Sequence, residues 1–124
     1  MSSNPCKEVD INGNTYVLQS ETEMAKGMDG MAFKIVRTHS AGVYAGYVES
    51  RVGKEVVIRN ARRLWRWYGA ASLSELAMRG TSQPDKCKFP MAVDRVELME
   101  AIEIIDCTEM ARKSIQEVPT WSAQ

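Results

Sequence analysis

The sequence predicts an α+β fold: a small, mainly antiparallel β-sheet or partly open barrel, with an N-terminal hairpin and two or three short helices. Short runs rich in valine, isoleucine and tyrosine alternate with glycine-containing turns between residues 9 and 59, a pattern typical of strands joined by tight connections. Two Ser-x-x-Glu sequences, at residues 20–23 and 72–75, are capping boxes that begin helices. A chain of 124 residues is enough for one domain with a single core.

Residues 1–30 are predicted to form an N-terminal hairpin appendage to a single domain over residues 31–124. Asn12-Gly13 separates two small β-prone runs between residues 9 and 18, which is the strongest short-range signal for a hairpin. The capping box at residues 20–23 then predicts a brief helix over Met24 and Ala25. Residues 27–30 contain two glycines and predict a flexible joint before the domain.

The first strands of the domain are predicted at residues 33–38, 43–48 and 55–59, with turns at residues 40–42 and at Val52-Gly53. Asn60-Ala61 is expected to form a bulge or bend, after which residues 62–67 continue in extended form. In an extended run alternate side chains point to opposite faces. The faces would then be Arg63, Trp65 and Trp67 on one side, and Arg62, Leu64 and Arg66 on the other.

After Gly69, the capping box at residues 72–75 predicts a short helix that ends at Gly80, followed by a polar loop over residues 81–90. Residues 93–107 are open to two interpretations. Two strands or one bulged strand, broken at Glu100, are favoured because Ile-Glu-Ile-Ile is β-prone, whereas Asp94 and Glu97 also fit a helix start. The strand interpretation places Val96, Leu98, Ile102 and Ile104 on one face. Thr108 is expected to cap a last helix over residues 109–118, which Pro119 ends.

Residues 59–68 concentrate four arginines, two of the three tryptophans and a tyrosine in one decapeptide. Guanidinium and indole groups recognise planar, anionic or aromatic partners. Three interpretations stay open: anchors of the core or of a subunit interface, a site for a nucleotide or single-stranded nucleic acid, and a protein-binding hot spot. Zero net charge favours a small ligand over a long nucleic acid. The candidate binding residues are Arg59, Arg62, Arg63, Trp65, Arg66, Trp67 and Tyr68.

Catalysis, metal and cofactor binding are not expected. The three cysteines form no Cys-x-x-Cys pair and His39 is the only histidine, which argues against a disulfide framework and a metal site. Phosphate-loop, nucleophile-elbow and His-Glu-x-x-His motifs are absent from the sequence. No apolar run approaches the roughly 20 residues that span a bilayer. The N-terminus has no pattern of a signal peptide, so we expect a cytoplasmic protein without a membrane partner.

Six acidic residues recur at every third position from Asp94 to Glu109. This period matches neither one strand face nor one helix face, so a solvated edge is favoured over a metal or catalytic cluster. These carboxylates have the opposite charge to the arginine run. The two are expected to pair within a chain or between copies, and a homo-oligomer is predicted.

Several segments carry a resemblance to a known family. They are residues 35–43, 53–57, 60–65 with Trp67, 69–73, 86–90, 100–105 and 107–109. In this order they resemble an uncharacterised domain family found in bacteriophages and prophages, and the hairpin with Ile11-Asn12-Gly13 is similar to N-terminal additions of some members. Arg66 stands where many members have an aromatic residue. The resemblance implies a phage origin and a small accessory protein, and it implies no reaction.

Together these features predict a non-catalytic phage accessory protein in the cytoplasm of the host cell. It would bind and neutralise an antiviral-defence component of the bacterium, either a nucleotide signal or a defence protein, through an Arg/Trp face. The alternative is a virion structural protein, a decoration or connector, that uses the same face for assembly. A nucleotide binder should have a pocket lined by arginine and indole, whereas a virion protein should bury those groups between subunits.

Overall fold

The computed structural model describes residues 8–11, 14–17 and 23–123, with side chains from residue 23 onward. Strands β1 (Glu8–Ile11) and β2 (Asn14–Val17) pair antiparallel, with Glu8 opposite Val17. Their connection, Asn12-Gly13, lies outside the described residues, so the N-terminal hairpin stays a prediction. Residues 20–22 of the first capping box also lie outside them.

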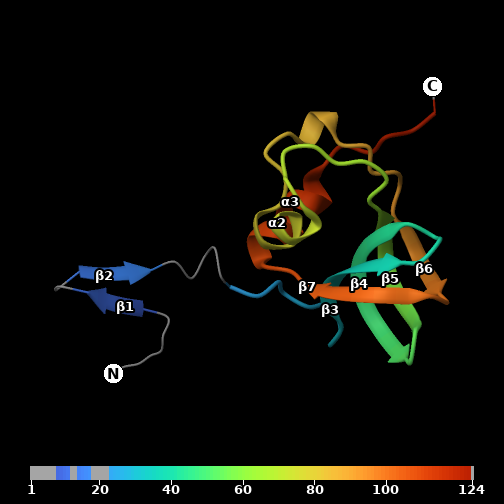
Figure 1. The fold of residues 1–124 in the computed structure, drawn as a ribbon, viewed down its shortest axis with the longest axis horizontal. Helices are drawn as coiled ribbons and strands as arrows, with labels where there is room; N and C mark the ends of the chain where they lie inside the picture. Colours follow the sequence, from blue (N-terminus) through green and yellow to red (C-terminus); the bar gives the residue numbers. More distant parts are fainter. Residues whose placement is uncertain (1–7, 12–13, 18–22, 124) are drawn as a thin grey trace.

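Five strands form one antiparallel sheet in the order β6-β5-β4-β3-β7 (Figure 1). The two edge strands β6 and β7 follow each other in the chain and are linked only by Met99 and Glu100. The sheet therefore curls until its two edges meet at this link, where the amide of Ala101 donates to the carbonyl of Lys54 at 3.0 Å. The predicted α+β class with a mainly antiparallel sheet is confirmed, and the hydrogen-bonded sheet is open. The strands are β3 (Ala32–Thr38), β4 (Val43–Val52), β5 (Glu55–Arg63), β6 (Val93–Leu98) and β7 (Ala101–Asp106).

The predicted bulge at Asn60-Ala61 is confirmed. Tyr47 of β4 lies opposite Arg59, and Ala45 lies opposite Arg62, so two residues of β5 face the single residue Gly46. Asn60 has a left-handed backbone with φ 51°, which asparagine tolerates better than most residues. The extra residue changes the alternation of β5, because Ile58 and Ala61, which are three residues apart, are both buried in the same cluster on one side of the sheet.

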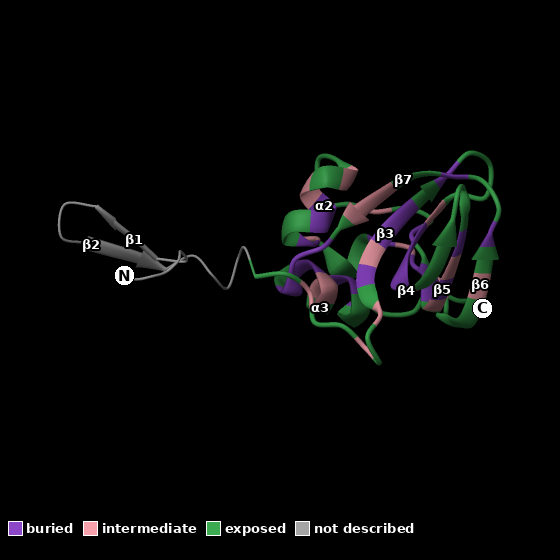
Figure 2. Ribbon diagram, turned by 90° about the horizontal axis from the view of Figure 1, so that it is seen from below, coloured by how far each residue is buried: buried purple, intermediate pink, exposed green. Residues whose placement is uncertain are grey.

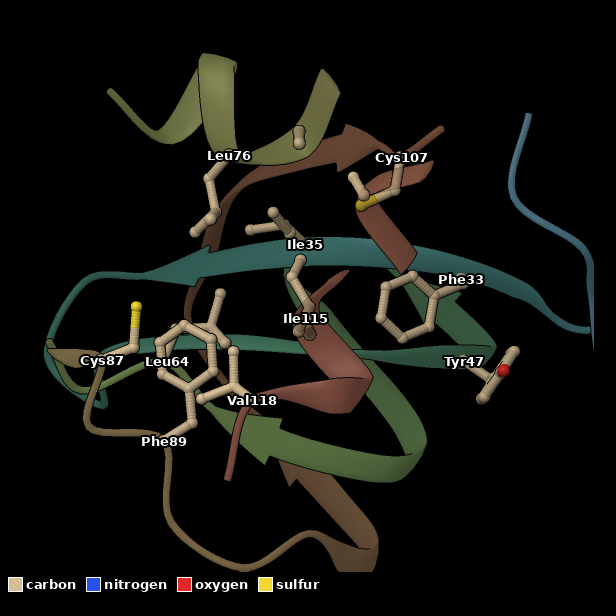
Figure 3. Close-up of a cluster of buried hydrophobic side chains, with 13 residues drawn as sticks. Phe33, Ile35, Tyr47, Leu64, Leu76, Cys87, Phe89, Cys107, Ile115 and Val118 are labelled. Atoms are coloured by element: carbon tan, nitrogen blue, oxygen red, sulfur yellow. The ribbon is translucent and has the colours of Figure 1, made fainter. Parts of the chain in front are cut away.

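Two clusters of buried side chains lie on opposite faces of the sheet. The first fills the space between the sheet and the helices α2 (Leu73–Arg79) and α3 (Glu109–Glu117) (Figure 3). The second lies on the other face, inside the curl, and leaves β6 mostly exposed (Figure 2). The first cluster includes Phe33, Ile35, Leu64, Leu76, Phe89 and Ile115. The second consists of Val36, Tyr44, Val56, Ile58, Ala61, Leu98 and Ala101.

Both helix starts predicted within the domain are confirmed. The hydroxyl of Ser72 accepts a hydrogen bond from the amide of Glu75 at 3.1 Å, and that of Thr108 accepts one from Ala111 at 3.1 Å. A short 3₁₀ turn, η1 (Pro84–Lys86), lies in the loop after α2. Among the described residues, none of the helices has the length and apolar character to cross a membrane.

The two-strand interpretation of residues 93–107 is confirmed, with the break at Met99 and Glu100. One part of it is wrong: Ile102 was expected to share a strand face with Val96, Leu98 and Ile104, but it is 49% exposed, whereas Ile104 packs against the second cluster. The register of β7 against β3 shifts between Glu103 and Ala101, so Ile102 is the extra residue of a bulge, and Ala101 enters the second cluster instead. The alternative helix from Asp94 is excluded by these strands.

The helix expected over Met24 and Ala25 is also wrong. Met24 forms an isolated β-bridge with Thr108, and the amide of Ala25 donates to the carbonyl of Cys107 at 3.0 Å. The amide of Lys26 donates to the Glu109 carboxylate at 2.7 Å. Tertiary hydrogen bonds with the start of α3 thus replace the helical ones, and residues 23–26 pack on the domain.

Helices α2 and α3 approach each other at Gly80, which predicts a specific destabilisation. A Cβ atom here would lie 2.3 Å from the Cβ of Ser114, and φ is +78°. We expect Gly80→Ala to lower the free energy of unfolding by about 2–4 kcal/mol, since backbone strain and overpacking add. Gly53→Ala is the matched control, because Gly53 also has positive φ (+60°) but no atom within 4 Å of the added Cβ. Urea unfolding of both variants measures the difference, and equal losses would contradict the steric explanation.

A second prediction concerns acid stability. The guanidinium of Arg112 donates from Nε to Oε1 of Glu109 at 2.9 Å, and this pairing lowers the pKa of Glu109 from 4.5 to about 2. A carboxyl with a depressed pKa in the folded state stabilises the fold above its unfolded pKa. Wild type should therefore exceed Glu109→Gln in free energy of unfolding at neutral pH, and the gap should shrink as pH falls from 4.5 to about 2. Glu117→Gln, an exposed position of the same helix, should leave the pH profile unchanged in urea titrations.

Candidate functional site

The seven candidate binding residues do not share one face. Strand β5 ends at Arg63, so the alternation expected through Trp67 stops there. The side chain of Arg59 is partly exposed, with its guanidinium 3.6 Å from the carboxylate of Glu49 and 3.7 Å from that of Asp94. The arginine run was predicted to pair with the period-three acids, and the contact between Arg59 and Asp94 is such a pair within the chain.

Arg62 is buried and serves the fold. It is 8% exposed, and its guanidinium donates to four backbone carbonyls. Nε donates to Pro90 at 3.0 Å, Nη1 to Ile115 at 2.9 Å, and Nη2 to Phe89 at 3.2 Å and Val118 at 2.6 Å. Burial lowers the pKa of the guanidinium from its ordinary value. A substitution at Arg62 therefore reports on folding rather than on binding.

Arg63, Trp67 and Tyr68 also make contacts within the domain. The guanidinium of Arg63 lies 4.6 Å from the ring centre of Tyr44 and donates to the carbonyl of Ala41 at 2.6 Å, which holds the β3–β4 turn. Trp67 is half-buried against the first core cluster. Tyr68 is 42% exposed, while its amide donates to the sulfur of Cys87 at 3.4 Å. Trp67 is thus an anchor of the core, as one of the three interpretations expected.

Trp65 and Arg66 form an exposed surface with two residues from distant segments. The rings of Trp65 and Trp121 stack in parallel, 4.9 Å apart with an interplanar angle of 6°. The guanidinium carbon of Arg66 lies 5.2 Å from the ring centre of Trp65, and Nζ of Lys88 lies 5.4 Å from that of Trp121. We call these four residues the tryptophan-pair surface.

Backbone hydrogen bonds hold the tryptophan-pair surface together. Arg66 and Lys88 exchange two of them, with N···O distances of 3.3 and 2.7 Å, and the amide of Trp121 donates to the carbonyl of Phe89 at 3.0 Å. Three segments that are remote in sequence therefore lie side by side. The cations and indoles are positioned by main-chain contacts, so the stack is organised before any partner binds.

The two cations of this surface have no carboxylate partner. Within residues 23–123, neither Arg66 nor Lys88 has an acidic oxygen within 4.0 Å. Most of the period-three acids are paired elsewhere in the molecule. Trp65 and Trp121 remain 51% and 44% exposed. The surface thus combines exposed aromatic area with two positive charges that have no carboxylate partner in the described part of the chain. The pairs of the acids are Asp94–Arg59, Glu97–Arg95, Glu103–Arg37, Asp106–Lys34 and Glu109–Arg112.

Sequence reasoning missed Trp121 and Lys88. Trp121 is the third tryptophan of the chain and follows the proline that ends the last helix. Lys88 lies in the segment 86–90, one of those that carry the family resemblance. Neither signal places these residues beside Trp65, because the contact depends on the path of the whole chain.

A cleft of about 400 Å³ opens between the β5 bulge and the C-terminal end of α3. Arg62 lines it, whereas no tryptophan does. In the part of the chain that the structure describes, no three histidine, cysteine or acidic side chains gather as metal ligands. Cys87 and Cys107 are buried and free, and burial raises the pKa of the Cys107 thiol to about 12.

The contacts of Arg62 predict that its loss affects folding. Arg62→Met should lower the free energy of unfolding by about 3–5 kcal/mol, since buried carbonyls lose their charged partner. Arg63→Met is the matched control and should cost about 0.5–1.5 kcal/mol, because Arg63 serves a single carbonyl at the surface. Urea unfolding of both variants gives the two values. Similar losses at the two positions would show that the buried hydrogen bonds of Arg62 contribute no more to the free energy of unfolding than the surface hydrogen bond of Arg63.

Comparison with known proteins identifies the domain. A sequence model of a domain of unknown function, DUF6948, matches residues 31–115, which is more than half of the chain. No curated protein and no solved structure matches. The prediction of an uncharacterised domain family is confirmed, and the phage origin stays a prediction. The chain belongs to the DUF6948 family.

Proposed function

We propose that the protein is a non-catalytic phage accessory protein that binds and neutralises an antiviral-defence protein of the host bacterium. The tryptophan-pair surface, Trp65, Arg66, Lys88 and Trp121, is the binding face. The observation that carries the proposal is the exposed stack of two indoles beside two cations that have no carboxylate partner within the described chain.

This surface has the composition of a protein-binding hot spot. Tryptophan and arginine are the residue types most enriched among side chains that dominate binding energy. Two tryptophans that are about half exposed leave apolar area in contact with water, which is favourable to bury against a partner. The stack is already ordered by backbone contacts, so binding costs little additional side-chain entropy.

The geometry supports a protein partner better than a nucleotide. A site for a nucleotide is normally concave and mostly encloses its ligand. The cleft beside Arg62 has a guanidinium but no indole, while the two indoles lie on the open surface and cover one face of each other. The free charges of Arg66 and Lys88 complement acidic side chains on the defence protein.

A virion structural protein is the second candidate, supported by a different surface. Val52 at the end of β4, Met99 in the β6–β7 link and Ile102 near the start of β7 are 75%, 60% and 49% exposed. Ile102 and the turn residue Gly53 line the same groove. Exposed apolar groups that lie together are typical of contacts between subunits, so an assembly role would use this corner.

The proposal predicts the behaviour of single variants during infection. Strains that each carry one defence system should be infected in the presence of the wild-type protein, Trp121→Ala or Met78→Ala. Wild type should raise the plating efficiency on at least one strain. Trp121→Ala should lose this effect, because truncation of a hot-spot residue weakens binding by about 2 kcal/mol or more. Met78→Ala removes another exposed apolar side chain, 48% exposed on α2, and should act as wild type.

Two results would contradict the proposal. One is that no tested defence system responds to the wild-type protein, and the other is full activity of Trp121→Ala. Mass spectrometry of purified particles then tests the second candidate. A copy number in fixed ratio to the major capsid protein would make the chain a virion component, whereas abundance only in infected cells supports neutralisation of the host.

A further inference from the structure

The cleft of about 400 Å³ beside the β5 bulge is separate from the tryptophan-pair surface. Its floor is apolar and is formed by the buried side chains of Phe33, Ala45, Ile115 and Val118. Polar side chains lie around its rim, and Tyr47, Arg62 and Ala92 complete its lining. The rim residues are Asn60, Gln116 and Thr120.

The hydroxyl of Tyr47 is a hydrogen-bond donor without an acceptor among the described residues. Tyr47 is 5% exposed and lies at the margin of the core cluster, with its hydroxyl directed away from the other labelled side chains (Figure 3). The hydroxyl oxygen accepts from Nε2 of Gln116 at 3.0 Å and from Nη1 of Arg112 at 3.4 Å. Within residues 23–123, the proton of this hydroxyl has no acceptor.

Arg62 brings a second unused donor. Its Nη1 carries two protons, and one of them is donated to the carbonyl of Ile115 at 2.9 Å. The other has no acceptor in the described part of the chain, and no carboxylate there lies within 4.0 Å of the guanidinium. Buried polar groups are nearly always hydrogen-bonded in folded proteins. Two buried residues with a spare donor line the same cleft, which indicates an acceptor that residues 23–123 do not supply.

We propose that this cleft binds a small oxyanion, a carboxylate or a phosphate, attached to an apolar body. The spare donors of Tyr47 and Arg62 bind the anionic oxygens, and the charge of Arg62 makes these hydrogen bonds stronger than neutral ones. The amides of Asn60 and Gln116 add donors at the rim. The apolar floor contacts the body of the ligand, and a cavity of about 300–1,000 Å³ is the usual size for a small-molecule site.

Three probes that share a phenyl ring test this assignment. Amide signals of the ¹⁵N-labelled full chain are followed by NMR during titration with benzoate, phenyl phosphate and benzamide. We expect benzoate or phenyl phosphate to shift the signals of Asn60, Gln116 and Thr120. Neutral benzamide should bind about tenfold more weakly or not at all, because it lacks the charge. A response to only one of the two anions identifies the class of the oxyanion.

Variants connect the binding to the residues. Tyr47→Phe removes the spare donor and should weaken binding of the anion about tenfold. Tyr44→Phe is the matched control, since Tyr44 is equally buried, at 5% exposed, but belongs to the cluster on the other face of the sheet. Asn60→Asp places a negative charge at the rim and should also weaken binding. Aspartate tolerates the left-handed backbone of this position. Asn60→Asp therefore tests anion binding in the cleft if Tyr47→Phe does not fold.

Three results would overturn the proposal. The first is that neither anion shifts these signals at millimolar concentration, which would mean that water satisfies both donors. The second is that benzamide binds as tightly as benzoate, which would make the cleft an apolar site without anion recognition. The third is that neither Tyr47→Phe nor Asn60→Asp differs from Tyr44→Phe. None of these three results bears on the proposed function, which the infection assays with Trp121→Ala test separately.

Discussion

The rest of the structure depends on the hydrogen bonds that the buried guanidinium of Arg62 donates to backbone carbonyls. A buried charge is costly unless polar groups replace the water that it loses. Here backbone carbonyls do so, and two of them, of Ile115 and Val118, lie at the C-terminal end of α3, where the helix dipole is negative. One side chain of β5 thereby fixes both the end of α3 and the segment that contains Phe89 and Pro90.

Both proposed binding surfaces follow from this arrangement. Because Arg62 fixes Phe89 and Val118, Trp121 is held beside the segment that Lys88 belongs to, and its ring reaches Trp65. The same contacts place Val118 and Thr120 in the wall of the cleft. Arg62 therefore positions the exposed indoles without being part of their surface. It also lines the cleft, where one proton of its Nη1 has no acceptor among the described residues.

Features that depend on a few neighbouring residues were predictable from the sequence. The caps at Ser72 and Thr108 and the bulge at Asn60-Ala61 are confirmed, because their hydrogen bonds and backbone angles are local. The Arg/Trp face depended on alternation continuing past the end of β5, which it does not. Arg62 binds carbonyls 27 to 56 residues away, and no local pattern contains that information. The face of Ile102 was predicted wrongly for a related reason, since the pairing of β7 with β3 has a register shift at this residue.

The spacing of the acidic residues has a consequence for the edges of the sheet. Since three is an odd number, successive acids on an extended strand point to opposite sides: Asp94 and Glu97 do so on β6, and Glu103 and Asp106 on β7. Each edge strand thus carries carboxylates above and below the plane of the sheet. A second copy that approached either edge as an additional strand would meet like charges on both sides, and charged edges of this kind oppose fibrillar aggregation.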